Sequence, residues 1–430
     1  MRVKLRNPDR IETVTGPKSV AGVLDELGIN PTTALVIHDG QLVTHGVELG
    51  DDAEVEIRPV ISGGAGDPVC KVCRQPAVLE TPRHRAAWCG AHFTDFVHKQ
   101  VRNAIERGDP TARPGGDPAG GGQGDSGHRQ RMFSYADRIL VAVSGGKDSL
   151  ALWKILLEMG YRADGLYIGL GIGGYSRRSG EICREFATRY AEPRGVELVT
   201  VDMESEYGYT TPSGSRTTNR PTCGVCGLSK RYIFNRVAVE RGYDVMVTGH
   251  NLDDEAATLF NNVLRWQEGF LARQSPVLPS TGANQARKVK PLYRLTEREM
   301  AAYCVINSID YVVEECPLVA GNTGTANKDV LAELERKAPG TAAQFLYGFL
   351  DNQAHKFEDA GHRAAGQQPD LCACQTCGMP TTNEVCAFCR QQDRILDGLG
   401  RERTSLPLVA PTSEDERESQ THELATKVNA

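Results

Sequence analysis

The feature that most constrains the fold of this chain is a short loop between an apolar run and a helical pattern. Residues Ile139–Val143 are all apolar, and Ser-Gly-Gly-Lys-Asp-Ser follows at Ser144–Ser149. From Leu150 onward, apolar residues recur at the spacing of a buried helix. Glycines allow a tight turn close to a ligand, and the free N–H groups at a helix N-terminus attract anions. The segment therefore predicts a strand, a phosphate-binding loop and a helix.

This loop matches neither the Gly-x-x-x-x-Gly-Lys-Ser/Thr pattern nor the Gly-x-Gly-x-x-Gly pattern of common nucleotide-binding proteins. Its Ser-Gly-Gly-x-Asp-Ser form resembles the pyrophosphate loop (PP-loop) of N-type ATP pyrophosphatases, which split ATP into AMP and pyrophosphate while adenylating a substrate. The resemblance implies ATP and Mg²⁺ as cofactors, and the alternative is an ordinary strand–helix turn. The expected ATP-binding residues are Ala142, Ser144, Gly145, Gly146, Lys147, Asp148, Ser149, Ile168 and Gly249.

Around this loop, residues 129–330 alternate predicted strands with predicted helices. The alternation predicts an α/β domain with a parallel sheet covered on both faces, and ligands bind at the carboxyl ends of such strands. The predicted strands are Ile139–Val143, Gly165–Ile168, Glu197–Val201, Val245–Thr248 and Tyr311–Val313. The predicted helices are Ser149–Glu158, Ser179–Arg194, Ser229–Arg241 and Glu255–Arg265.

The chain has 13 cysteines, and most of them lie in close groups that predict metal sites rather than disulfides. Two close pairs separated by a longer gap are the spacing of a structural tetrahedral zinc site. Two such sets are present, one in residues 68–108 and one in residues 370–400. The expected Zn²⁺ ligands are Cys70, Cys73, Cys89 and His92 in the first set, and Cys374, Cys377, Cys386 and Cys389 in the second. In the second set, Cys372 is a rival first ligand.

A third pair, Cys223 and Cys226, precedes a predicted helix and has no second pair nearby to complete four zinc ligands. Another thiol, Cys316, follows the last predicted strand in the sequence Glu-Cys-Pro. Lys230 lies one helical turn after Cys226. Asp254 stands in a run of three carboxylates at the end of another predicted strand, near the expected position of the phosphates.

Together these motifs closely resemble the TtcA/TtuA family of tRNA 2-thiolation enzymes, over roughly residues 68–395. The two zinc sets indicate the TtuA branch, which thiolates uridine in the tRNA T-loop. By this resemblance, Cys223, Cys226 and Cys316 hold three irons of a 4Fe–4S cluster, and the fourth iron stays open for sulfur. A zinc ion or a persulfide relay is the alternative at these thiols.

Three residues have expected roles in this chemistry. Lys147 is expected to neutralise the departing pyrophosphate, and Lys230 to lie near both the cluster and the substrate. Asp254 matches the family's catalytic carboxylate and is expected to assist proton transfer or to position the base. The structural alternatives are a surface salt bridge for Lys230 and a helix cap for Asp254.

Residues 1–64 predict a small α+β domain of two strands, a helix, a hairpin and a last strand that ends near Gly63-Gly64. This order resembles the β-grasp sulfur carriers of the ubiquitin, ThiS and MoaD type, which carry sulfur as a thiocarboxylate on a terminal glycine. Here Gly64 is internal, so a carrier role requires cleavage after it and an E1-like activating enzyme. Docking without sulfur chemistry, with a separate carrier as donor, is the alternative.

The remaining segments are predicted from composition. Residues 109–128 are a Gly- and Pro-rich linker, 331–368 are helical, and 401–430 are a polar tail expected to be disordered. The net charge of −6 confines any RNA-binding surface to local patches. Arg287–Lys290 is the densest basic patch, either a tRNA contact or a solvated loop. No apolar run could span a membrane and no signal peptide is apparent, so we expect a cytoplasmic protein.

The predicted function is therefore that of an ATP-dependent tRNA 2-thiouridine synthase. It would adenylate the uridine C2 oxygen and replace it with sulfur delivered through the 4Fe–4S cluster. The family resemblance also implies a homodimer. The alternatives are the same chemistry on another tRNA nucleoside or a small molecule, and a non-catalytic zinc-ribbon protein that binds RNA.

Overall fold

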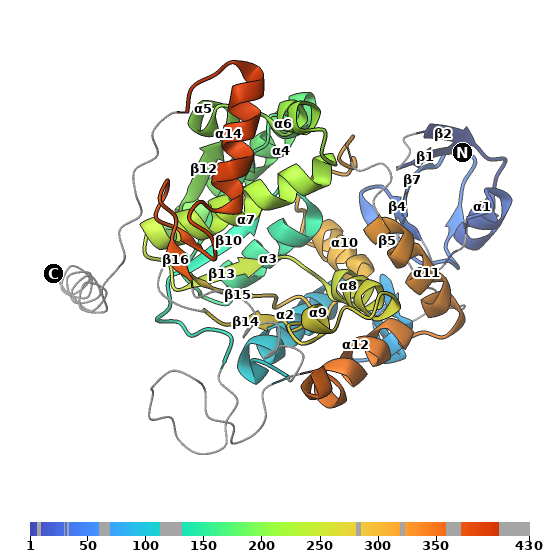
Figure 1. Cartoon of the computed structure of the whole chain (residues 1–430). Coiled ribbons are helices and arrows are strands. Elements are labelled where there is room, and N and C mark those ends of the chain that lie inside the picture. The colour runs from blue at the N-terminus through green and yellow to red at the C-terminus, as the bar shows by residue number, and fades with distance from the viewer. Residues whose placement is uncertain are drawn as a thin grey trace.

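The computed structural model describes residues 1–6, 10–29, 31, 34–59, 69–111, 131–280, 285–318, 323–357 and 371–403. Figure 1 shows a large body with a smaller N-terminal domain on one side. Several predictions lie outside the described residues. They concern Gly64 with the end of the 1–64 domain, most of the 109–128 linker, the end of the 331–368 segment and the tail beyond residue 403.

A six-stranded sheet forms the centre of the large body, in the order β12-β11-β10-β13-β15-β14. All strands but β14 are parallel, and β14 is an antiparallel edge strand. Because β10 lies between β11 and β13, the strand order reverses beside it, which opens a crevice at its carboxyl end. The strands are β10 (Ile139–Val143), β11 (Ala163–Gly169), β12 (Leu198–Asp202), β13 (Val245–Thr248), β14 (Val277–Leu278) and β15 (Arg287–Val289).

Both faces of this sheet are covered, as the alternation of side chains on β10 shows. Val141 is buried in one apolar cluster with the helices α3 (Lys147–Glu158) and α10 (Glu297–Ile306). Leu140 is buried in a second cluster with α7 (Thr222–Glu240), on the opposite face. The predicted α/β fold with a doubly covered parallel sheet is therefore confirmed.

The other helices of the body surround these two clusters (Figure 1). They are α2 (Gly90–Arg107), α4 (Gly173–Phe186), α5 (Met203–Tyr207), α6 (Thr211–Thr218), α8 (Leu252–Leu264), α9 (Glu268–Leu271), α11 (Thr323–Lys337), α12 (Thr341–Asn352) and α14 (Ala387–Leu399). A small hairpin lies beside each metal-ligand set in the chain. The two hairpins are β8 (Leu79–Thr81) with β9 (Ala86–Trp88), and β16 (Cys372–Ala373) with β17 (Pro380–Thr381).

The sequence misplaced four elements near the site. The helix α7 begins at Thr222, so its cysteine pair lies within the helix and not before it. Residues 311–313 form no strand, and the basic patch at 287–289 forms β15 instead of a loop. The predicted helix from Ser179 to Arg194 begins earlier, at Gly173, and changes after Phe186 into a π-helical turn and a 3₁₀ turn.

The N-terminal domain contains a five-stranded mixed sheet in the order β2-β1-β7-β4-β5. The strands β1 and β7, which are the first and last of the domain in chain order, lie side by side and are parallel. The other pairs of this sheet are antiparallel. The elements are β1 (Arg2–Leu5), β2 (Arg10–Thr13), β3 (Lys18–Ser19), α1 (Val20–Glu26), β4 (Ala34–His38), β5 (Gln41–Val43), β6 (Glu48–Leu49) and β7 (Glu54–Pro59). Its interpretation as a β-grasp sulfur carrier stays a prediction.

Candidate functional site

The phosphate loop lies at the carboxyl end of β10, where two glycines permit close packing. Gly145 has a φ of +80°, and a Cβ there would lie 2.9 Å from the carbonyl oxygen of Ser179. A Cβ on Gly249, at the end of β13, would lie 3.0 Å from the backbone nitrogen of Ser149. The Ser149 hydroxyl accepts a hydrogen bond from the Ser144 amide at 3.1 Å. The loop is therefore fixed by its neighbours, with the N-terminus of α3 directed into the crevice.

A cavity of about 320 Å³ opens beside this loop, within the range of about 300–1,000 Å³ for small-molecule sites. Lys230 and Tyr175 line the same cavity from α7 and α4. Of the predicted ATP-binding residues, those that line it are Ala142, Ser144, Gly146, Asp148, Ser149, Ile168 and Gly249. Gly145 and Lys147 do not line it, although both belong to the loop. The sequence thus located most of one continuous pocket wall.

Lys147 and Asp254 belong to a network of charges in the first turns of α3, α8 and α10. The Lys147 ammonium lies 2.8 Å from Glu297 and 3.2 Å from Asp148. Lys328 of α11 lies 2.6 Å from Asp254 and 3.2 Å from Glu297. Burial works to raise the pKa of Glu297, but Lys147 and Lys328 outweigh it and lower that pKa to about 2. Glu297 therefore remains ionised and joins the two lysines.

Asp254 reaches the phosphate loop through Asn251, the N-cap of α8. The Asn251 amide nitrogen donates to Asp148 at 3.0 Å, and its backbone N–H donates to Asp254 at 3.1 Å. Asp254 is thus the third helical residue of a capping box, as well as the partner of Lys328. The N-cap alternative raised for Asp254 is therefore wrong, because Asn251 is the N-cap of α8. One carboxylate oxygen of Asp254 accepts from the Asn251 backbone, and the other contacts Lys328.

Two residues of this network, Glu297 and Lys328, were not predicted from the sequence. Both lie far along the chain from the loop, Glu297 in α10 and Lys328 in α11, so no pattern near the loop points to them. The only local signal at Glu297 is the capping box of Thr296 and Glu299, which marks a helix start and not a function.

Three thiols lie near the cavity wall. Cys223 and Cys226 lie in the first turns of α7, and Cys316 follows a segment without helix or strand. Burial raises the pKa of Cys226, and the neighbouring thiols Cys316 and Cys223 raise it further, while Lys230 opposes them. Burial also raises the pKa of Tyr175, with Cys316 and Cys226 adding to the effect. Since Tyr175 lines the cavity, the thiols and the phosphate loop share one neighbourhood.

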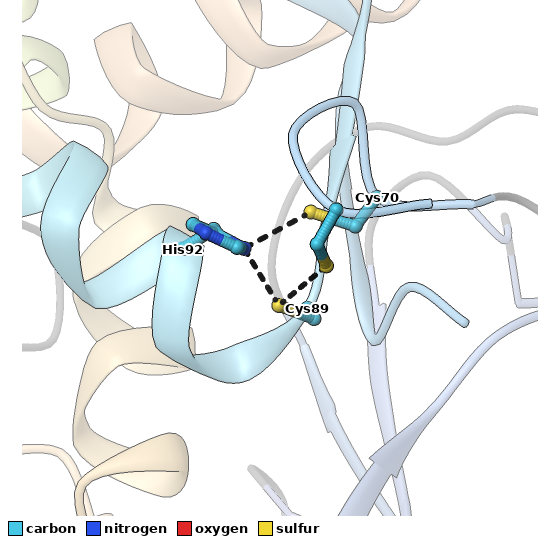
Figure 2. Close-up of side chains that lie close together, drawn as sticks. Cys70, Cys89 and His92 are labelled. Carbon is cyan, nitrogen blue, oxygen red and sulfur yellow. Dashed lines mark hydrogen bonds between the residues drawn. The ribbon is translucent and has the colours of Figure 1, made fainter. Parts of the chain in front are cut away.

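These three thiols do not form a compact single-ion set, whereas two other groups among the described residues do. In the first, the His92 imidazole lies 3.5 Å from the Cys70 sulfur and 3.2 Å from the Cys89 sulfur. Figure 2 shows these three side chains directed toward one another. Cys73 lies 3.8 Å from Cys89 and completes the group. The four ligand atoms all lie within 4.8 Å of one another, so this group could hold one metal ion.

The second group is Cys374, Cys377, Cys386 and Cys389, all four buried, with ligand atoms again within 4.8 Å. The rival ligand, Cys372, is exposed and directs its thiol to the carbonyl oxygens of Thr381 and Asn383. This group lies against α7, where the ring of Phe388 stacks on Tyr232 at 3.8 Å.

The basic patch Arg287–Lys290 is largely engaged within the body. Lys290 pairs with Glu255 at 2.8 Å, and Arg287 pairs with Asp137 at 3.5 Å. Burial lowers the pKa of Lys288, helped by nearby Arg231. The solvated-loop interpretation of this patch is therefore wrong for residues 287–289, which form β15, whereas the tRNA contact stays a prediction.

Known proteins match most of this chain. The model of the PP-loop domain matches residues 128–317, and that of the N-terminal LIM domain of 2-thiouridine synthetase TtuA matches residues 69–94. A tRNA-5-methyluridine(54) 2-sulfurtransferase of Thermus thermophilus is 44% identical over 327 residues, which cover 76% of this chain and 92% of the relative. The chain belongs to this sulfurtransferase family. The predicted family and enzyme class are confirmed.

A second relative and a solved structure are also similar to this chain. An enzyme of the same name from Pyrococcus horikoshii is 38% identical over 321 residues, covering 75% of this chain and 92% of the relative. The structure of the U34-tRNA thiolase NcsA from Methanococcus maripaludis, with its [4Fe-4S] cluster, has a TM-score of 0.54 at 20% identity. It covers 76% of this chain and 95% of NcsA, which shows a shared fold. Across the described part of this sulfurtransferase, no helix has the length and apolar character needed to cross a bilayer.

Proposed function

We propose that this chain is an ATP-dependent tRNA 2-thiouridine synthase that adenylates the C2 oxygen of a uridine and then replaces that oxygen with sulfur. The observation that supports it best is one cavity lined by the phosphate loop, Lys230 and Tyr175, with the thiols of Cys226 and Cys316 near Tyr175. The relatives named for 5-methyluridine(54) make that T-loop nucleoside the proposed target.

In the first half-reaction, the loop and the N-terminus of α3 would bind the phosphates of Mg·ATP, with adenine near Ile168 and Gly249. The uracil C2 oxygen would attack the α-phosphorus, and pyrophosphate would leave. Burial opposes the charge on Lys147, but Asp148 and Glu297 raise its pKa, so the ammonium stays protonated. It can therefore stabilise negative charge on the departing pyrophosphate.

Two further residues would act on the nucleoside. Lys230 lines the cavity one turn after Cys226, so its ammonium can lie between the thiols and the bound base. Asp254, held by Lys328 and by the Asn251 amide, would assist proton transfer or hold the base in position. Once the C2 oxygen carries AMP, that oxygen becomes a good leaving group when sulfur attacks C2.

The three thiols Cys223, Cys226 and Cys316 fit a 4Fe–4S cluster, because they are neighbours without being close enough for one ion. When bound, the cluster would supply a coordination position for sulfur on the iron that no cysteine holds. We assign one Zn²⁺ to each four-ligand group, since compact sets of thiolate and imidazole ligands suit tetrahedral zinc. Neither group leaves a ligand position open, so both would be structural.

The proposed partners are tRNA, a second copy of the chain in a homodimer, and a sulfur carrier. The carrier is either this chain's own N-terminal domain, cut after Gly64 and activated by an E1-like enzyme, or a separate protein. The parallel pairing of β1 with β7 supports a β-grasp fold for that domain. Intact mass after expression with the activating enzyme would show a fragment ending at Gly64, and full-length chain alone would refute the cleavage.

The function is tested by anaerobic purification and reconstitution, followed by iron, sulfide and zinc counts. The protein is then incubated with Mg·ATP, a sulfide source and tRNA from a strain that lacks the modification. We expect 2-thiolated 5-methyluridine by mass spectrometry of nucleosides, with AMP formed in equal amount. Asp254→Asn and Cys316→Ala should both abolish the product, and only Cys316→Ala should lose iron.

The alternatives give different results in the same assay. Sulfur found on another nucleoside would show that this nucleoside, and not 5-methyluridine, is the substrate. AMP formed without tRNA would indicate a small-molecule substrate. A protein that binds tRNA but forms no AMP would be a non-catalytic RNA-binding protein.

A further inference from the structure

The N-terminal domain is packed onto the catalytic body by one face of its sheet. Leu35, Ile37 and Leu42 are only 3%, 7% and 6% exposed, and they belong to the same apolar cluster as α3 and α10. Their neighbour Val36 belongs to the domain's own core. Because successive side chains of a strand point to opposite faces, β4 lies between two cores. The domain is therefore a docked part of the molecule.

A polar contact accompanies this apolar face. The Arg58 Nη1 donates to the Tyr311 hydroxyl at 2.8 Å, and its guanidinium carbon lies 5.3 Å from the centre of the Tyr311 ring. The Arg58 Nε donates to Glu56 at 2.7 Å, and Glu56 also accepts from Arg6 at 3.1 Å. Contacts within the N-terminal domain thus orient the guanidinium toward Tyr311 of the body.

Tyr311 begins a segment that leads directly to the candidate site. The next residue, Val312, donates its backbone N–H to the carbonyl oxygen of Gly145 in the phosphate loop at 2.9 Å. Four residues later the segment reaches Cys316. Residues 311–316 form neither helix nor strand, so no ladder of backbone hydrogen bonds fixes their position. Contacts such as those of Tyr311 and Val312 must do so.

We propose that Arg58 is a positioning residue through which the N-terminal domain holds residues 311–316 in place. In this position Val312 stabilises the phosphate loop and Cys316 stays beside Cys226. The domain thereby orders the ATP-binding loop and the thiol site together, whether or not its own chain is ever cut. The part that concerns Cys316 rests on the proposed function, since it takes that thiol as a cluster ligand.

The first measurement is hydrogen exchange by mass spectrometry on the full chain, reading the peptides that cover residues 309–316. In Arg58→Ala the Val312 amide should exchange about tenfold faster, because a hydrogen bond of ordinary net strength loses its support. Tyr311→Phe, which removes the hydroxyl but keeps the ring, should give a smaller acceleration. Combining the two should add little to Arg58→Ala alone, since both act through one contact.

The second measurement is iron content and the visible absorption of the reconstituted cluster. Arg58→Ala should hold less iron than the wild type while keeping both zinc ions. The matched control is Arg2→Ala, which removes an exposed ion pair with Glu54 in the same domain and should change neither iron nor exchange.

Unchanged exchange at 309–316 in Arg58→Ala would overturn the proposal, as would equal acceleration in Arg2→Ala. If Arg58→Ala does not fold, as judged by zinc content, Tyr311→Phe decides the matter alone. A wild-type protein that takes up no iron would refute the cluster, and the exchange measurement would still decide whether Arg58 holds the segment.

Discussion

Gly145 combines a left-handed backbone with a contact that leaves no room for a methyl group. Gly145→Ala should therefore displace the loop, and the affinity for ATP should fall by at least about tenfold, because the left-handed region alone costs about 1–2 kcal/mol. Isothermal titration with a non-hydrolysable ATP analogue measures this.

The neighbouring glycine provides the control for that substitution. Gly146 has a φ of −83°, and a Cβ there would meet its nearest atom, the Ser144 hydroxyl, at 3.5 Å. Gly146→Ala should keep most of the affinity. Equal losses in the two variants would contradict the steric account of the loop.

Asp253 should give stability an unusual dependence on pH. Burial raises its pKa to about 7 in the folded protein, from 3.8. Between these values the folded state binds the proton that the unfolded state has lost, so this contribution to stability falls as pH rises through 7. Asp253→Asn has no such loss. As pH rises from 5.5 to 7, the free energy of unfolding of Asp253→Asn should increase relative to that of the wild type by up to about 1 kcal/mol per pH unit.

Urea unfolding at several pH values measures this difference, with zinc present throughout. Glu333→Gln serves as the comparison, because hydrogen bonds from Arg336 and Lys337 lower the pKa of that carboxyl to about 2 and it stays ionised over the range. Parallel curves for wild type and Asp253→Asn would show that Asp253 is ionised in the folded protein.

At the scale of elements, α7 connects the thiol site to the C-terminal metal-ligand group. Its N-terminal turns carry Cys226, and its middle carries Tyr232, which stacks on Phe388 and hydrogen-bonds to Cys377. Gln391 of α14 also donates to Ser229 at 3.3 Å. The group thus holds the helix that presents the cysteine pair.

Cys377→Ser should therefore lose one zinc and, in addition, most of the iron. Cys73→Ser should lose one zinc and keep the iron, because its group lies at the N-terminus of α2 and not on α7. Metal analysis of both variants after identical reconstitution makes the comparison. Equal iron in the two would mean that α7 keeps its place without the C-terminal group.

Features set by neighbouring residues could be predicted from the sequence, whereas features set by distant contacts could not. The phosphate loop is local, since a strand, two glycines and a helix start follow one another. The contact of Lys328 with Asp254 joins residues far apart in the chain, and nothing around Lys328 marks it. The strand β15 was missed because three residues with two basic side chains resemble a loop, and only pairing with the neighbouring strands β13 and β14 makes them a strand.

At the scale of the whole molecule, the N-terminal domain should stay bound after its covalent link is cut. A specific protease site placed between Pro59 and Val69 would separate the chain into two pieces. We expect the pieces to co-elute on gel filtration, because Leu35, Ile37 and Leu42 are buried in the body.

Leu42→Lys tests this directly, since it places a charge in that buried face. The cleaved variant should elute as two separate species. The control is Ile11→Lys, on the exposed strand β2, where the side chain is 54% exposed. Separation of the unmodified pieces would show that the covalent link, and not the apolar face, keeps the domain in place.

The apolar face that holds the N-terminal domain on the body also affects how sulfur would reach the enzyme. A domain joined to its own binding surface has an effective local concentration on the order of millimolar, far above that of any free competitor. If that domain carries the sulfur, each enzyme molecule begins with one sulfur atom already bound. Later turnovers then depend on how fast the desulfurised domain dissociates, or on how fast it receives new sulfur while it stays bound. Selection on such a fusion would then act on release as much as on chemistry.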